Sequence, residues 1–241
     1  MRILRKLFPS PEEKLAKRLT LVKTIQHDAA SQTMEAIGAY RESVDNDPES
    51  VMSGAIDEVC IGLVHAYCGT LPPATWDTKE LVTETSQFFD TKPDLSEAQT
   101  RNEAWDVLIR QMKDAYIRHR ENTITSLIGA HDSCKSNNTC NQEDACAIWE
   151  KFLRTTLCYT VDSQWRNYRN RMETLDSQLD RGARSKIADK INWFIDQDNL
   201  SHPIGVYKRE AARIYFETMK AVSREVLTCV CHTHPKDIPH K

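Results

Sequence analysis

The four residues best suited to hold a metal ion lie together near the C-terminal end of the sequence. Cys229, Cys231, His232 and His234 fall within six residues, and thiolate and imidazole groups are ligands that zinc prefers. Structural zinc sites usually draw their ligands from two segments of chain, whereas these four share one expected helix end. Zinc is therefore the candidate cofactor here. The favoured alternative is a frayed tail in which Cys229 packs and the histidines meet solvent.

A second stretch with reactive side chains runs from residue 131 to residue 140. Cys134 and Cys140 could form a redox-active pair or help to bind a metal ion. The dipeptide His131-Asp132 resembles the HD pair of metal-dependent phosphohydrolases, which are all-helical, but the same dipeptide also occurs earlier in the chain. A plain polar turn between two helices is the favoured interpretation.

Basic residues cluster between positions 166 and 186, beside two aromatic residues. The candidates for nucleic-acid binding are Arg166, Arg169, Arg171, Arg181, Arg184 and Lys186. Arginine can hold phosphates and exposed aromatic rings can stack on bases. However, Trp165 and Tyr168 fall on an apolar helix face, where we expect them to be buried. Nucleic-acid binding is therefore an alternative to the favoured interpretation, which is a set of solvated helix faces.

The first eight residues combine basic and apolar side chains. The candidates for membrane contact are Arg2, Ile3, Leu4, Arg5, Lys6, Leu7 and Phe8. On a helix the apolar residues would share one face, which is typical of a segment that lies on a membrane surface or of a short import signal. The favoured alternative is a turn that tucks Leu7 and Phe8 into the core.

No sequence motif points to catalysis. The chain lacks GxGxxG, GxxxxGK[ST], GxSxG and HExxH, and it contains only 7 glycines, so a backbone loop that cradles phosphate is hard to build. We therefore identify no catalytic residue and no small-molecule substrate. Whether the protein is an enzyme stays undecided, with the balance against it.

These residues must be positioned by helices, because the 9 prolines lie at joints and alternating strand patterns are nearly absent. The longest element is an antiparallel helical hairpin from Asp94 to Leu179. Its first arm begins with Asp94 as cap and Glu97 three residues later. Its second arm starts near Asn141. The apolar seam of that arm repeats in steps of four and three: Val161, Trp165, Tyr168, Met172, Leu175 and Leu179.

The remaining helices are expected to pack on this hairpin. The patterns predict them at residues 11–45, 48–67, 77–89, 187–199 and 207–231. The whole is an all-α chain, a single irregular bundle of about seven helices. We divide it into a basic amphipathic N-terminal segment (1–10), a helical bundle domain (11–232) and a flexible C-terminal tail (233–241).

Charge and cysteine content favour a protein-binding role inside the cell. The net charge is −3, which gives no overall attraction to nucleic acid or anionic lipid. The first eight residues lack a long apolar stretch of the secretory type, so we expect the 8 cysteines to be reduced. We predict a non-catalytic, intracellular, cytoplasmic subunit or adaptor of a larger assembly, with organellar import left open. Its partner would be another protein or a second copy of the chain. The alternatives are a nucleic-acid binder and a metal-stabilised or redox-responsive protein.

Overall fold

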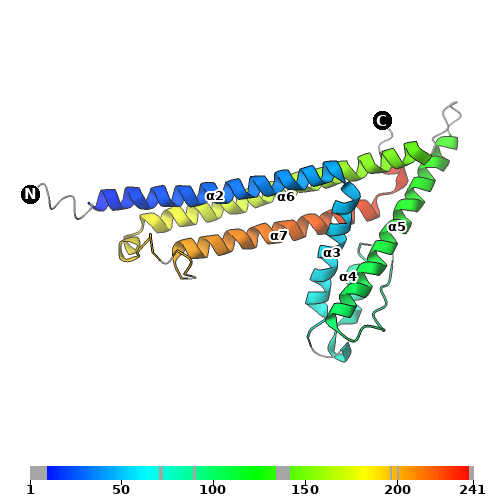
Figure 1. The fold of residues 1–241 in the computed structure, drawn as a ribbon, viewed down its shortest axis with the longest axis horizontal. Coiled ribbons are helices and arrows are strands. Elements are labelled where there is room, and N and C mark those ends of the chain that lie inside the picture. The colour runs from blue at the N-terminus through cyan, green and yellow to red at the C-terminus, as the bar shows by residue number, and fades with distance from the viewer. Residues whose placement is uncertain are drawn as a thin grey trace, which may run out of the picture. The chain divides into compact units, whose positions relative to one another are not determined.

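The computed structural model describes residues 10–70, 73–88, 91–133, 142–195, 197–199 and 201–238. In this part of the chain there are six α-helices, three short 3-10 helices and no strand (Figure 1). The α-helices are α2 (Pro11–Asn46), α3 (Pro48–Tyr67), α4 (Thr78–Thr85), α5 (Arg101–Ser133), α6 (Gln142–Arg184) and α7 (Pro203–His232). The predicted all-α fold class is confirmed. No described helix is both long enough and apolar enough to cross a bilayer.

The chain forms two compact units, and α2, α6 and α7 each contribute residues to both. Unit 1 comprises residues 1–40 and 163–219, and unit 2 comprises residues 41–162 and 220–241. The two units therefore alternate along the chain: residues 41–162 of unit 2 separate the two segments of unit 1, and residues 220–241 of unit 2 follow the second of them.

Unit 1 consists of three long helices in alternating directions. The side chain of Gln26 on α2 donates to the carbonyl of Asp176 on α6 (3.2 Å), while Thr33 lies beside Tyr168. Residue numbers rise along one helix as they fall along the other, so α2 and α6 are antiparallel. The pairs Asp176–Tyr207 and Arg171–Glu217 show the same relation between α6 and α7. Helices α2 and α7 consequently run in the same direction.

Unit 2 is built around α3 and the predicted hairpin. Asp47 caps α3 by accepting from the Ser50 N–H (3.0 Å), and Pro48 occupies the first turn, where no N–H is needed. Helix α3 contributes eight buried residues to this unit. Its buried residues are Pro48, Met52, Ala55, Ile56, Val59, Cys60, Leu63 and Val64. The two arms of the hairpin meet where Trp149 of α6 lies 6.4 Å from the ring of Tyr116 of α5.

The start of the hairpin differs from the prediction. Helix α5 begins at Arg101, whereas Asp94 accepts from the Ser96 N–H (2.9 Å) in a short turn. The capping box is formed by Thr100 and Glu103, whose side chains each accept from the other's backbone N–H at 3.2 Å. Two cap-like sequences compete in this stretch, and only the second leads directly into the apolar stripe.

The helix predicted at 187–199 is also wrong. Helix α6 continues beyond Leu179 to Arg184, and a 3-10 helix at Lys186–Lys190 is followed by turns. Of the four apolar residues that suggested a helix, Ile187, Phe194 and Ile195 are exposed, and only Ile191 packs partly against the core of unit 1. The packing that would have stabilised a short helix is therefore missing.

Candidate functional site

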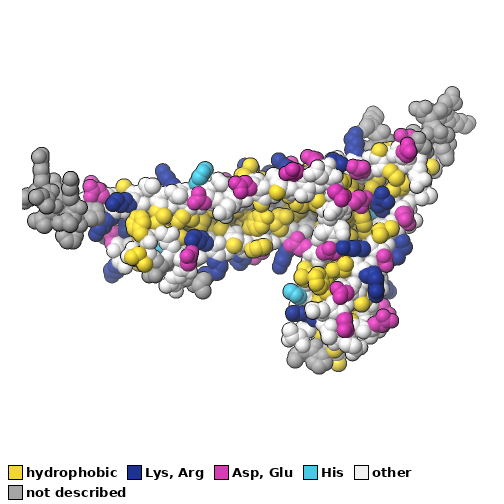
Figure 2. All heavy atoms as spheres, in the orientation of Figure 1, with side chains coloured by type: hydrophobic (Ala, Val, Ile, Leu, Met, Phe, Trp, Pro, Cys, Tyr) yellow, Lys and Arg dark blue, Asp and Glu magenta, His cyan; other side chains and the backbone are white. Residues whose placement is uncertain are grey.

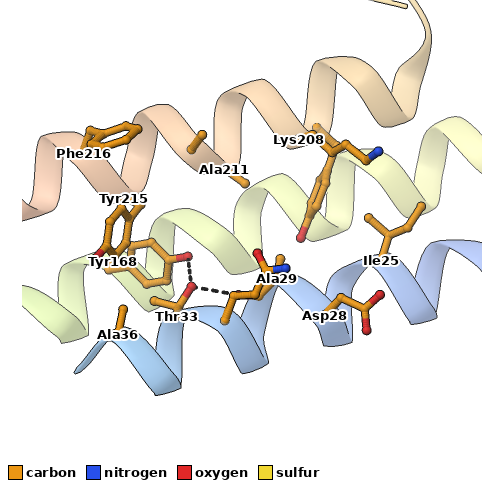
Figure 3. A pocket seen from close by; sticks show the side chains of 13 residues that line it. Ile25, Asp28, Ala29, Thr33, Ala36, Tyr168, Lys208, Ala211, Tyr215 and Phe216 are labelled. Carbon is orange, nitrogen blue, oxygen red and sulfur yellow. Dashed lines mark hydrogen bonds between the residues drawn. The ribbon is translucent and has the colours of Figure 1, made fainter. Parts of the chain in front are cut away.

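An open groove lies on unit 1 between α2 and α7, with α6 beneath it (Figure 3). Its volume is about 640 Å³. It is lined by Ile25, Asp28, Ala29, Gln32, Thr33, Ala36, Tyr168, Tyr207, Lys208, Ala211, Ala212, Tyr215 and Phe216. We call it the unit-1 groove. Figure 2 shows a band of hydrophobic side chains along these helices.

The floor of the unit-1 groove is fixed by hydrogen bonds. The hydroxyl of Thr33 donates to the carbonyl of Ala29 (2.8 Å), so the hydroxyl of Tyr168, 2.9 Å away, donates to Thr33. Burial raises the pKa of Tyr168, and Trp165 stacks on its ring with centroids 4.6 Å apart. The hydroxyls of Thr33 and Tyr168 are therefore both engaged in hydrogen bonds within unit 1.

The walls combine small side chains with large apolar ones. Ala29 and Ala36 of α2 lie across the groove from Ala211 of α7 (Figure 3), and Ala212 also lines it. Phe216 is 63% exposed. Small residues let another helix approach closely, and an exposed aromatic ring gains contact area when it is covered. This arrangement suits binding of an apolar surface.

The two rims of the unit-1 groove carry opposite charges. Asp28 lies on the α2 rim and Lys208 on the α7 rim, where its Nζ is 2.8 Å from Oδ1 of Asp198. The hydroxyl of the neighbouring Tyr207 donates to Asp176 of α6 (2.8 Å). Burial is the main cause that raises the pKa of the Asp176 carboxyl, although the bond from Tyr207 opposes it.

The basic residues singled out for nucleic-acid binding are spread along the surface. Arg171 pairs with Glu217 of α7, and the side chain of Arg181 donates to the carbonyl of Ser177 in its own helix. The other four, Arg166, Arg169, Arg184 and Lys186, are exposed. Tyr168 is buried and Trp165 is partly covered, as their position on the apolar seam indicated. Neither ring is fully open for stacking on a base, and nucleic-acid binding stays a prediction.

The C-terminal cysteine and histidine residues lie in unit 2 and make separate local contacts. His232 Nε2 lies against the carbonyl of Gln87, and His234 Nδ1 accepts from the Lys236 N–H. Burial raises the pKa of the Cys231 thiol, which disfavours the thiolate that zinc requires. Within the described ranges, no three histidine, cysteine or carboxylate side chains could share a metal ion.

A polar cleft adjoins these residues and includes one that the sequence did not reveal. His119 of α5 lines it together with Cys231, His232 and His234. The Nε2 of His119 lies 3.1 Å from the carbonyl of Val230, and burial lowers the pKa of the ring. No motif links residue 119 to the C-terminal end, so only the fold brings them together.

Two sets of predicted site residues lie outside the described residues. These are the membrane-contact segment Arg2, Ile3, Leu4, Arg5, Lys6, Leu7 and Phe8, and the redox pair Cys134 and Cys140. Both remain predictions.

Comparison with known proteins gives one family. The protein-family model described as SecA Wing and Scaffold domain matches residues 28–234. The matched range includes most of both units and every residue that lines the unit-1 groove except Ile25. No curated protein matches the chain.

Proposed function

The chain belongs to the SecA Wing and Scaffold domain family, and we propose that it is a non-catalytic scaffold that holds a helical segment of a partner protein in the unit-1 groove. The partner would be a component of a SecA-type translocation assembly. Membership makes the chain an all-helical scaffold domain of the SecA type. The groove supplies the finer proposal, because it is open and its floor and walls are largely apolar.

The occupant that fits best is one amphipathic α-helix. Helices α2 and α7 lie side by side on α6, and a fourth helix over the groove would complete a four-helix arrangement, in which each helix buries one apolar stripe. Helices pack at about 8–10 Å between axes, and the alanines of both walls allow the close end of that range.

The rim charges favour one orientation of that helix. A basic edge would lie over Asp28 on the α2 rim, and an acidic edge over Lys208 on the α7 rim. Rim charges of this kind act mainly on register and association rate rather than on affinity. The apolar floor and walls would supply most of the binding free energy.

The proposal rests on one observation, which is the presence of the unit-1 groove in a chain of this family. A variant of the groove surface tests the proposal. Ala212 is exposed in the groove, so Ala212→Glu places a charge on the apolar wall without disturbing the core. We expect this variant to lose co-purification with the translocation component that wild type retains. The matched control is Ala30→Glu, because Ala30 is exposed on α2 and does not line the groove. Equal recovery with wild type and Ala212→Glu would contradict the proposal.

A further inference from the structure

One face of α5 in unit 2 carries a stripe of polar side chains. Its members recur at spacings of three and four residues, so they lie on the same side of the helix. They are His119, Asn122, Thr123 and Ser126. This stripe forms one wall of the polar cleft, whose volume is about 800 Å³. Of the described residues that line the cleft, none is acidic.

The opposite wall is the segment that follows α7, and its own contacts hold it in place. Ile238 is only 2% exposed, and the 3-10 helix at Pro235–Asp237 packs against α5. His234 caps this 3-10 helix by accepting from the Lys236 N–H at Nδ1 (3.2 Å). The ring proton of neutral His234 therefore lies on Nε2, which is left to donate elsewhere. The cleft is thus bounded by two elements that pack on each other.

The end of α7 would by itself repel an anion, because the last carbonyls of a helix carry partial negative charge. Two of these carbonyls already accept hydrogen bonds from side chains. The carbonyl of Val230 accepts from Nε2 of His119 (3.1 Å), and that of Cys229 accepts from the hydroxyl of Thr233 (2.5 Å). These bonds offset much of the negative charge that α7 would present to the cleft.

The side chains that remain for a ligand are mainly hydrogen-bond donors. Asn122 and Lys236 are exposed and offer an amide and an ammonium group, and His234 adds its Nε2–H. The hydroxyl of Ser126 is already engaged, since it donates to the carbonyl of Asn122 (2.8 Å). A lysine and two further donors without a carboxylate among them suit an anionic oxygen ligand.

We propose that this cleft binds a small, water-soluble anion that carries a phosphate group. The ammonium group of Lys236 would pair with the phosphate, while the Asn122 amide and the His234 Nε2–H would donate to its oxygens. A phosphate group carries about −1.5 to −2 charges at pH 7 and three strong acceptor oxygens, so it can meet donors from both walls at once. This inference goes beyond the unit-1 groove and does not depend on it, because the groove and the cleft share no residue.

The test is an NMR titration of the full chain with inorganic phosphate. EDTA is present throughout, so that no metal ion mediates binding, and sodium chloride and sodium acetate at matched ionic strength are the comparisons. We expect phosphate to shift the backbone amides of residues 119–126 and 231–236 along a saturating curve. Chloride should leave them unchanged, and acetate, with fewer oxygens and less charge, should bind more weakly than phosphate.

Paired variants assign the binding to the cleft. Asn122→Asp replaces a donor with a carboxylate of the same size and should weaken phosphate binding about tenfold. Its matched control is Asn102→Asp, an exposed position of α5 that does not line the cleft, which should bind like wild type. Lys236→Gln should weaken binding about two- to fivefold. Lys79→Gln, at an exposed position of α4, is the control for that change.

The same spectra report folding, because amides far from the cleft should keep their wild-type positions in every variant. The proposal is overturned if phosphate shifts the cleft amides no more than chloride does, or if acetate binds as tightly as phosphate. It is also overturned if Asn122→Asp and Lys236→Gln, both folded, bind phosphate like wild type.

Discussion

The hydroxyl of Tyr116 on α5 donates a 2.6 Å hydrogen bond to Oε2 of Glu49, which lies in the first turn of α3. The other carboxylate oxygen accepts from Arg120 Nε (2.9 Å) and from the indole of Trp149 on α6 (3.1 Å). One carboxylate thus joins three helices of unit 2. Burial is the main cause that raises the pKa of Tyr116, with the Glu49 bond adding to it, so the tyrosine stays a donor at neutral pH.

Removal of this carboxylate should destabilise unit 2. Glu49→Ala leaves the buried Trp149 N–H and the Tyr116 hydroxyl without their acceptor, and we expect a loss of about 2–4 kcal/mol in the free energy of unfolding. Urea unfolding followed by tryptophan fluorescence measures it. The control Glu121→Ala removes an exposed carboxylate from α5 and should cost less than about 0.5 kcal/mol. Equal effects of the two substitutions would show that the Glu49 contacts contribute nothing.

Gly205, in the first turn of α7, should not tolerate a side chain. A Cβ there would lie 2.2 Å from the carbonyl oxygen of Asn199, so Gly205→Ala should cost about 1–3 kcal/mol through forced backbone movement. Gly62→Ala in α3 is the control, because nothing lies within 4 Å of its Cβ position. That change should stabilise by up to about 1 kcal/mol through helix propensity. Thermal unfolding of both variants measures these changes in stability. An unchanged stability of Gly205→Ala would contradict the close approach of the Asn199 carbonyl to residue 205.

The Thr33–Tyr168 hydrogen bond in the floor of the unit-1 groove should make a modest contribution to stability. Tyr168→Phe removes the donor, but the Thr33 hydroxyl keeps its bond to the Ala29 carbonyl, so no polar group is left buried without a partner. We expect a cost of about 0.5–1.5 kcal/mol by chemical denaturation. Tyr159→Phe, at an exposed position, should be neutral. A cost above about 3 kcal/mol would mean that the hydroxyl supports more than this one contact.

Asp176 should make the stability of unit 1 fall as pH rises. Burial raises the pKa of its carboxyl above the unfolded value near 3.8, so the folded state keeps the proton longer than the unfolded chain does. Its stabilising contribution is therefore complete below that value and is lost as pH rises through the folded pKa. As the pH is raised from 3 to 7, the melting temperature of Asp176→Asn should increase relative to that of wild type.

Glu84 supplies the opposite case in unit 2. Its bond from Arg224 is the main cause that lowers the pKa of the carboxyl below 4.5, and the Tyr67 bond adds to it. Its contribution is present above the unfolded value and is lost as pH falls through the folded pKa. As the pH is raised over the same range, the melting temperature of Glu84→Gln should decrease relative to that of wild type. If both variants changed in the same direction, the assignment of these two carboxyls would be refuted.

The elements that the sequence predicted well are those with strong local signals. The helix predicted at residues 48–67 agrees with α3, because its cap Asp47 and its first-turn Pro48 act within a few residues. The start of α5 was missed because the Asp94 and Thr100 caps both look competent locally. A helix was predicted at residues 187–199 from their apolar periodicity. Periodicity alone does not show whether another element will cover the apolar face of such a helix.

The candidate site was beyond sequence reasoning for a different reason. The alanines of the unit-1 groove have no chemistry of their own, and on the printed sequence they only dilute the apolar stripe of α2. Ala29 and Ala211 become opposite walls only when α6 brings their helices together. The C-terminal cysteine and histidine residues gave the clearest local signal, yet they make separate contacts in the fold.

The most direct test of the scaffold proposal is site-specific photocrosslinking in the native host. A photoreactive amino acid at Ala212 probes the unit-1 groove, and the same amino acid at Ala30 probes the other side of α2. We predict that position 212 forms an adduct which mass spectrometry identifies as a helical segment of a translocation component, and that position 30 does not. Equal labelling at both positions, or an adduct at 212 only with proteins unrelated to translocation, would contradict the account.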